Sequence, residues 1–200
     1  MPGMIGDSNS GVTIVDLLDS PDFIHRKHKP VEPTRVQHAL KRLEARIAGN
    51  PMAALQDLVE IAVEACGADS SGVSLEEEDE KGELRFRWVV VAGSFARYLN
   101  GTTPRFYSPC GTCLDRGAPQ LYQVFNQYYN FLGVTAEPIL DGLLIPWRCK
   151  TNQGTIWLVS HRSECAFDMA DYEFMRTLAD YVAGAMSKIV SASGDEFKAA

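Results

Sequence analysis

Apolar residues predict two helices where the regular part of the chain begins. The first helix starts after Thr34, a candidate cap; the second starts at Asn50, which can cap the helix, with Pro51 at its first position. The second helix ends at Gly67 and has a wide apolar face, so we expect it to lie on the core. The first helix has a narrow stripe at nearly heptad spacing, which suits packing against another helix. The members of this stripe are Val36, Leu40, Leu43 and Ile47.

Four segments have the composition of β-strands. Residues 70–75 and 84–91 are predicted as strands, joined by an exposed acidic hairpin loop, residues 76–83, that lacks the ligand spacing of a calcium loop. Residues 142–149 and 154–160 are apolar on both faces, as expected in a sheet covered on each side, and a short turn joins them. Alternation in the second strand predicts one face made of Leu84, Phe86, Trp88 and Val90.

The last helix is the best specified element of the sequence. Asp168 is its expected cap, Asp171 lies in the first turn, where negative charge suits the helix dipole, and Phe167 and Tyr172 are placed for a hydrophobic staple. Its apolar stripe also has near-heptad spacing. The members of that stripe are Met175, Leu178, Ala179, Val182, Met186 and Ile189. Two such stripes predict a homodimer formed through the terminal helices; the alternative is that both stripes are used inside one subunit.

The order of elements predicts an α+β fold. Two helices and two strands are followed by an irregular middle segment, residues 105–133, and then by two strands and a helix. This order suggests an antiparallel sheet with the terminal helices on one face and the irregular segment closing the other face. Long connections of this kind usually form binding loops or lids.

Length and composition predict one domain with a real core. The chain has 200 residues, of which 46% are hydrophobic. Residues 1–33 are rich in Gly, Ser and Pro and are expected to form a flexible extension, residues 34–190 the domain, and residues 191–200 a tail.

Charge and hydropathy argue against nucleic-acid and membrane partners. The formal net charge of −7 disfavours nucleic-acid binding, which needs a clustered basic face. The sequence has neither an apolar run of the roughly 18 residues needed to span a bilayer nor a secretory leader. We therefore expect a cytoplasmic protein without a membrane partner, and free thiols at its five cysteines.

Four segments, taken in order, resemble the GAF domains of bacterial sensor proteins. Residues 54–75 resemble the family's entry helix and first strand, and residues 108–122 a Gly-containing turn, short helix and strand. Residues 141–161 resemble its paired strands, and residues 167–186 its closing helix. The resemblance spans roughly residues 50–190 and implies a profilin- and PAS-related fold. Because the family includes cyclic-nucleotide, bilin, haem and metabolite binders, the resemblance does not fix a ligand.

The middle segment and the neighbouring strands are dense in aromatic residues. Large rings beside a few polar groups are typical of a concave small-molecule site, although ordinary core is the alternative. Arg105 could pair with an anionic ligand, with a surface arginine as the alternative. The candidate ligand-binding residues are Arg105, Tyr107, Cys110, Cys113, Tyr122, Phe125, Tyr128, Tyr129, Trp147 and Trp157.

The Cys110–Cys113 pair raises a second hypothesis, a thiol-dependent redox sensor or an enzyme similar to the free methionine sulfoxide reductases. A short helix after Pro109 could lower a thiol pKa, but no His or Lys lies nearby in the sequence to stabilise a thiolate. The motifs of that reductase group are also missing. We favour cysteines that line an apolar pocket.

Metal and chromophore sites are not predicted. A zinc site would need two more ligands from Cys149, Cys165 or His161, and neither a second CxxC nor a close His pair is present. Many bilin-binding GAF domains carry a Cys-His dipeptide to which the bilin is attached, and no cysteine of this chain is followed by histidine. We interpret His161 as a strand-end residue whose hydrogen bonds are made within the protein.

The leading hypothesis from the sequence is a non-enzymatic, small-molecule-binding sensory domain in bacterial signal transduction. The resemblance to input domains of sensor kinases implies a two-component context. If the chain ends at residue 200, its output is expected to be a separate signalling partner.

Overall fold

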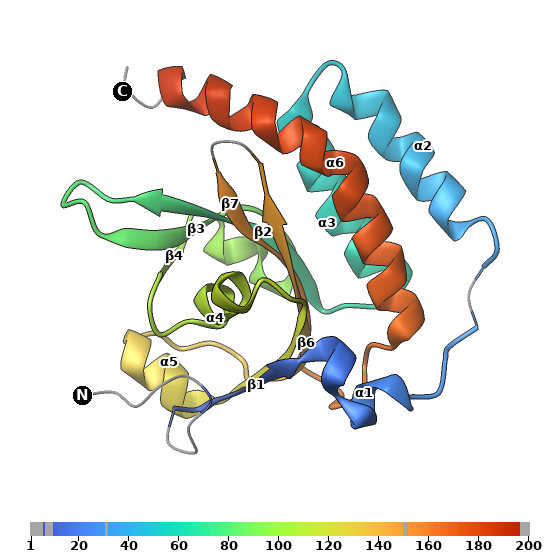
Figure 1. The fold of residues 1–200 in the computed structure, drawn as a ribbon, viewed down its shortest axis with the longest axis vertical. Coiled ribbons are helices and arrows are strands. Elements are labelled where there is room, and N and C mark those ends of the chain that lie inside the picture. Colours follow the sequence, from blue (N-terminus) through green and yellow to red (C-terminus); the bar gives the residue numbers. More distant parts are fainter. Residues whose placement is uncertain (1–5, 7–9, 31, 150–151, 197–200) are drawn as a thin grey trace.

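The computed structural model shows an α+β fold built on one seven-stranded antiparallel sheet (Figure 1). The structure describes residues 6, 10–30, 32–149 and 152–196, with the backbone alone for 184–196. The strand order is β1-β5-β6-β7-β2-β3-β4. The strands are β1 (Val12–Asp16), β2 (Ser70–Glu78), β3 (Leu84–Gly93), β4 (Thr102–Pro104), β5 (Gln120–Val124), β6 (Ile139–Arg148) and β7 (Gln153–Ser160).

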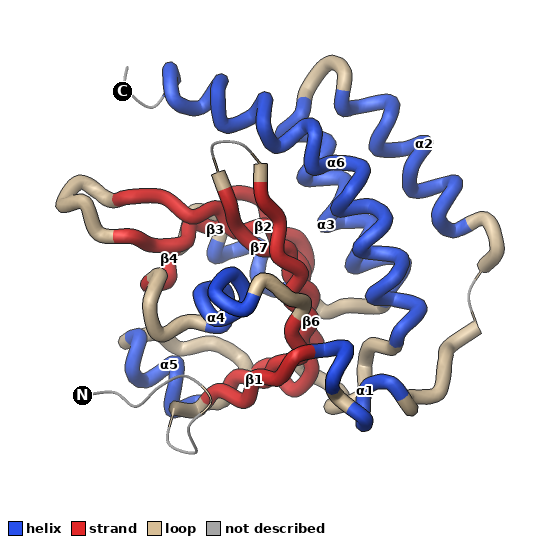
Figure 2. The backbone as a smooth tube through the Cα atoms, in the orientation of Figure 1, coloured by secondary structure: helices blue, strands red, loops and turns tan. Residues whose placement is uncertain are grey.

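Helices lie on both faces of this sheet. Figure 2 shows the sheet curling around α4, with α5 near its lower rim and the long helices on the opposite face. On that far face α3 and α6 contact the strands, and α2 packs on α3 and α6. The helices are α1 (Pro21–Ile24), α2 (Arg35–Ile47), α3 (Pro51–Cys66), α4 (Pro109–Arg116), α5 (Asn126–Leu132) and α6 (Met169–Glu196), with short 3-10 helices η1 (Leu17–Asp19) and η2 (Ser94–Tyr98). No helix in the described part of the chain is long and apolar enough to cross a membrane.

The predicted ends of α3 and the start of α6 are confirmed, but Thr34 does not cap α2, because its side chain forms no capping hydrogen bond and its backbone is already helical. Asn50 caps α3 by accepting a hydrogen bond from the N–H of Ala53, and Gly67 ends that helix in the left-handed conformation. Asp168 accepts hydrogen bonds from the N–H groups of Ala170 and Asp171 at the start of α6. These local signals fix the helix ends because they satisfy backbone groups that have no partner within the helix.

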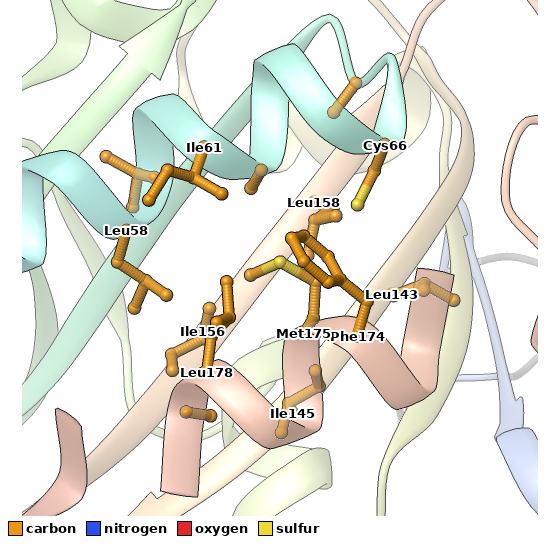
Figure 3. Packing of buried hydrophobic residues seen from close by; sticks show 14 of the residues in the cluster. Leu58, Ile61, Cys66, Leu143, Ile145, Ile156, Leu158, Phe174, Met175 and Leu178 are labelled. Atoms are coloured by element: carbon orange, nitrogen blue, oxygen red, sulfur yellow. The ribbon is translucent and has the colours of Figure 1, made fainter. Parts of the chain in front are cut away.

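The core between helices and sheet, here called the helix-side cluster, uses the predicted apolar stripes. Figure 3 shows Leu58 and Ile61 of α3 facing Met175 and Leu178 of α6 above the strands. Leu43 of α2 is fully buried, and the rest of the α2 stripe packs against the same cluster. The described side chains of both stripes are therefore used within one subunit. Met186 and Ile189 lie outside the described side chains.

The segment expected to be a flexible N-terminal extension instead builds part of the fold. β1 pairs with β5 over five residue pairs, from Val12–Val124 to Asp16–Gln120. Leu17 and Phe23 are fully buried in the helix-side cluster. This strand was not predicted because it has only five residues and its pairing partner β5 lies far along the chain.

Arg26 fixes the end of this segment to β6 and to the loop before α6. Its guanidinium forms two hydrogen bonds with the Asp141 carboxylate of β6, at 2.7 and 3.0 Å, and a third with the carbonyl oxygen of Phe167. The same carboxylate accepts hydrogen bonds from the N–H groups of Ala166 and Phe167 just before α6. Asp141 therefore joins β6, the N-terminal segment and the entry to α6.

The predicted face of β3 is wrong from Val90 onward. The pairing of β3 with β2 shifts between Val73 and Ser74, which leaves Val89 as an extra residue in a β-bulge. Phe86 and Trp88 therefore face one side of the sheet, whereas Val90 packs in the helix-side cluster. A bulge inverts the alternation because it inserts one residue into a two-residue repeat.

Candidate functional site

A cavity of about 530 Å³ lies on the sheet face opposite the long helices. Its walls come from β3, η2 and β4, from the inner strands β5 and β7, and from the segment that carries α4 and α5. Exposed Leu84 and Val134 belong to its lining. Seven aromatic side chains line it: Trp88, Phe95, Tyr98, Tyr122, Tyr128, Tyr129 and Trp157.

Four of these rings form one continuous wall. The Trp88 ring lies 5.0 Å from Trp157 and 6.1 Å from Phe95 between centroids, and Phe95 lies 5.4 Å from Tyr98, edge to face. Gly72 allows Trp157 to lie flat on β2, since a Cβ at this glycine would meet the indole at 2.2 Å. Offset and edge-to-face ring pairs of this kind are favourable and rigid.

Three tyrosines from β5 and α5 form a second group of rings. The Tyr122 ring packs on Gly142 of β6, where a Cβ would approach it to 2.4 Å. Tyr128 donates a hydrogen bond from its hydroxyl to the carbonyl oxygen of Tyr107, at 3.1 Å. Tyr129 is also buried, but its hydroxyl has no partner among the described residues. Burial raises the pKa of Tyr122, Tyr128 and Tyr129 well above the ordinary tyrosine value.

A small polar group lies beside the cavity, beneath α4. Thr155 donates a hydrogen bond to the Cys110 sulfur at 3.2 Å, and the Trp157 indole N–H donates to Ser74 Oγ at 3.1 Å. Ser74 and Thr155 are fully buried, and Cys110 is buried and lines the cavity. Burial raises the pKa of the Cys110 thiol, although the hydrogen bond from Thr155 and the thiol's own hydrogen bond to Ser74 Oγ oppose this shift.

Capping residues within the segment 105–117 position α4. Ser108 caps the helix by accepting the N–H of Gly111 at 3.0 Å, Pro109 occupies the first position, and Gly117 ends the helix in the left-handed conformation. Gly111 is required because a Cβ there would lie 2.1 Å from the carbonyl oxygen of Arg105. The helix is thereby pressed against β6 and β7 with Cys110 on its inner side.

Arg105 lies outside the cavity lining and has protein partners already. Its guanidinium is buried, pairs with Glu76, and donates to Asp115 at 2.6 Å. Burial opposes its charge, yet these two carboxylates raise its pKa. The side chain therefore links the loop after β4 to β2 and α4. Its positive charge is already neutralised by Glu76 and Asp115, so it is poorly placed to bind an anionic ligand.

The structure brings together half of the predicted site residues. The lining contains Cys110, Tyr122, Tyr128, Tyr129 and Trp157. Cys113 is fully buried, and burial raises its pKa. Tyr107 contacts the Tyr128 ring at a tilted angle from outside the lining, Phe125 lies at a second hollow beside β1, and Trp147 packs in the helix-side cluster.

Sequence reasoning missed three of the wall residues. Phe95 and Tyr98 lie in η2, a segment for which no function was expected, and Trp88 was assigned only to a strand face. The signal that could have found them is the aromatic spacing from Trp88 through Tyr98, directly after a strand face that already contained Phe86.

The described residues contain no group of three or more His, Cys, Asp or Glu side chains arranged to hold a metal. The five cysteines are free, with Cys149 partly exposed and Cys165 exposed. His161 Nδ1 lies 2.8 Å from the carbonyl oxygen of Pro138, and its ring contacts Phe95 at 4.7 Å between centroids.

Thiol accessibility gives a direct test of the redox hypothesis. We expect iodoacetamide at neutral pH to modify Cys165 first and to leave Cys110 and Cys113 unmodified in the folded chain, because burial disfavours their thiolates. Peptide mass spectrometry before and after unfolding in urea measures the order. Modification of Cys110 as fast as that of Cys165 would instead support thiol chemistry in the cavity.

The sheet, its helical layer and the aromatic cavity define a class: an α+β domain with a ligand-sized cavity on the sheet face away from its long helices. No family model matches the sequence, and no curated protein matches it. Solved structures do match, and they identify the fold as that of GAF domains.

Three of these structures illustrate the range of the fold. A GAF domain of a phosphoenolpyruvate-protein phosphotransferase from Coxiella burnetii is 17% identical, with a TM-score of 0.61, over 80% of this chain and 98% of that one. Free methionine-R-sulfoxide reductase from Neisseria meningitidis, in complex with its substrate, is 16% identical, with a TM-score of 0.60, over 84% and 99%. The phycoerythrobilin-bound GAF domain of a cyanobacterial phytochrome is 12% identical, with a TM-score of 0.56, over 78% and 97%.

Proposed function

We propose that this chain is a sensory or regulatory domain that binds a small molecule in the aromatic cavity. The observation that carries the proposal is the cavity itself, about 530 Å³ in volume and lined by seven aromatic side chains. Ligand sites in proteins are typically concave, mostly apolar and roughly 300–1,000 Å³ in size. The bilin-bound and substrate-bound structures that share the fold are consistent with this use of the same architecture.

The strands that wall the cavity also carry the helix-side cluster. Along β7, Trp157 points to the cavity while Ile156 and Leu158 pack under the helices, and β6 alternates in the same way with Leu143 and Leu144. A ligand that orders residues 105–133 would therefore act on strands that contact α3 and α6. We propose that binding is transmitted by a shift in the packing of these helices.

We further propose that the domain works in the bacterial cytoplasm as a homodimer, together with a signalling partner of the two-component type. The described parts of both apolar stripes are buried within one subunit, so the dimer contact would use the end of α6. Figure 1 shows the last turns of α6 continuing past α2 and α3.

Native mass spectrometry of the purified chain, combined with a thermal-shift screen of metabolites, tests the binding function. We expect a copurified or added small molecule that raises the melting temperature. The same spectrum reports the number of subunits. An Ala136→Trp variant should abolish the shift, because Ala136 lies in the cavity lining on the loop between α5 and β6, and an indole there would occupy the space.

The matched control is Ala45→Trp, which places the same side chain on the exposed surface of α2 and should leave the ligand response intact. A bare chain in the mass spectrum, together with no stabilising compound for the wild type, would contradict a binding function.

A further inference from the structure

This inference rests on the proposed function, that the cavity binds a small molecule. The charged residues around the cavity then indicate whether that molecule is anionic or neutral. Arg85 is the only basic residue among the described lining residues, and it forms an ion pair with Glu77 at 3.2 Å. Asp79 and Glu83 of the hairpin loop contribute two carboxylates to the same lining. An anionic ligand would meet this negative potential without a free cation to balance it.

Two backbone N–H groups at the nearby start of α4, where anions often bind, are also occupied. The N-terminus of α4 borders the cavity through Pro109 and Cys110. Pro109 has no N–H, and the N–H groups of Gly111 and Thr112 donate to the side chain and the carbonyl oxygen of Ser108. A phosphate at this helix end would therefore find the N–H groups of Gly111 and Thr112 already in use.

Two residues of the lining, in contrast, carry a buried hydroxyl group that no described residue pairs. The Tyr129 hydroxyl and Thr103 Oγ1 are buried atoms without a partner among the described residues. A buried hydroxyl left unpaired is costly, so such groups normally find a partner. Because burial keeps the Tyr129 hydroxyl protonated, it can donate a hydrogen bond to an acceptor atom on the ligand.

The rings determine the shape of the ligand. Trp88, Phe95 and Trp157 form a wall of aromatic faces and edges on one side of the cavity. Such a wall favours a flat aromatic partner, which can stack on it. We propose that the cavity takes an uncharged, planar aromatic molecule that carries a hydrogen-bond acceptor such as a carbonyl oxygen, and that it rejects phosphate-bearing molecules.

Three probes test this ligand class on the whole chain by titration calorimetry: xanthone, xanthene, which has the same ring system without the carbonyl, and cyclic AMP. We expect xanthone to bind about fivefold more tightly than xanthene, as one neutral hydrogen bond allows. Cyclic AMP should neither bind nor displace xanthone.

The variant Tyr129→Phe removes the hydroxyl alone and should erase the difference between xanthone and xanthene. Tyr181→Phe makes the same change at an exposed position on α6 and should preserve the difference. Equal affinity for xanthone and xanthene in the wild type, or displacement of xanthone by cyclic AMP, overturns the ligand class while leaving the binding function intact. A wild type that binds none of the three probes also overturns the ligand class, and the mass-spectral and thermal-shift results then decide separately whether the cavity binds any molecule.

Discussion

Replacing Asp141 with alanine is expected to lower the free energy of unfolding by about 3–5 kcal/mol, because the change leaves a buried guanidinium without its partner. The Asp141 and Arg26 side chains are 1% and 10% exposed, and two backbone N–H groups before α6 depend on the same carboxylate. Denaturation in urea, monitored by far-UV circular dichroism, measures the loss.

Two comparisons test this explanation. Asp22→Ala removes an exposed carboxylate from α1 and should change stability by less than about 0.5 kcal/mol. Arg26→Met should also destabilise the fold. Burial raises the pKa of Asp141, opposed by Arg26 and by the N–H groups of Ala166 and Phe167, so losing Arg26 raises that pKa further.

The pH dependence of the Arg26→Met variant has a definite sign. A carboxyl whose folded pKa is raised binds more protons in the folded state, so its contribution to stability falls as pH rises through that pKa. The deficit of Arg26→Met relative to the wild type should therefore shrink as pH falls toward the ordinary carboxyl pKa of about 4. A deficit that does not change with pH would show that packing, and not the charge of Asp141, sets the cost.

Trp157→Ala should lower the free energy of unfolding by about 3–5 kcal/mol and abolish ligand binding. The indole is 3% exposed, contacts Trp88 and Phe95, and donates a hydrogen bond to the buried Ser74. Its loss removes the centre of the aromatic wall. Urea denaturation measures stability, and ligand titration well below the melting temperature of the variant measures binding.

Trp147→Ala is the matched control, because Trp147 is also buried but lies on the neighbouring strand β6 and on the opposite face of the sheet. It should cost a similar amount of stability and leave ligand binding unchanged. Loss of binding in both variants would indicate that the cavity depends on overall stability and not on the wall.

The helices and the closing strands could be predicted from the sequence because their signals are local. Asn50 and Asp168 cap their helices, and Gly67 ends one, since each of these residues satisfies the backbone within a few positions of itself. The β-bulge at Val89 could not be predicted in this way, because it depends on the pairing of β3 with β2. The role of residues 10–30 was missed for the same reason: Arg26 finds its partner 115 residues further along the chain.

The residues of the candidate site also fall into two groups, those that could be predicted from local sequence and those that depend on strand pairing. Tyr122, Tyr128 and Tyr129 were found because the middle segment is dense in aromatic residues, whereas Phe95 and Tyr98 reach the cavity only through the turn that η2 makes after β3. Trp147 was assigned to the site because it is aromatic and near in sequence, yet strand alternation places it on the far face. The density of aromatic residues in the sequence located the segment, but the pairing of the strands determines which rings lie together in the cavity.

β1 covers the edge of β5, and this protects the sheet from pairing with other chains. An unpaired strand at a sheet edge is a template for self-association. The sheet has β1 at one edge and the three-residue β4 at the other, and the rest of the N-terminal segment is fixed by Arg26. A chain begun at residue 34, where the helical pattern starts, would expose β5 along its length and would be prone to aggregate.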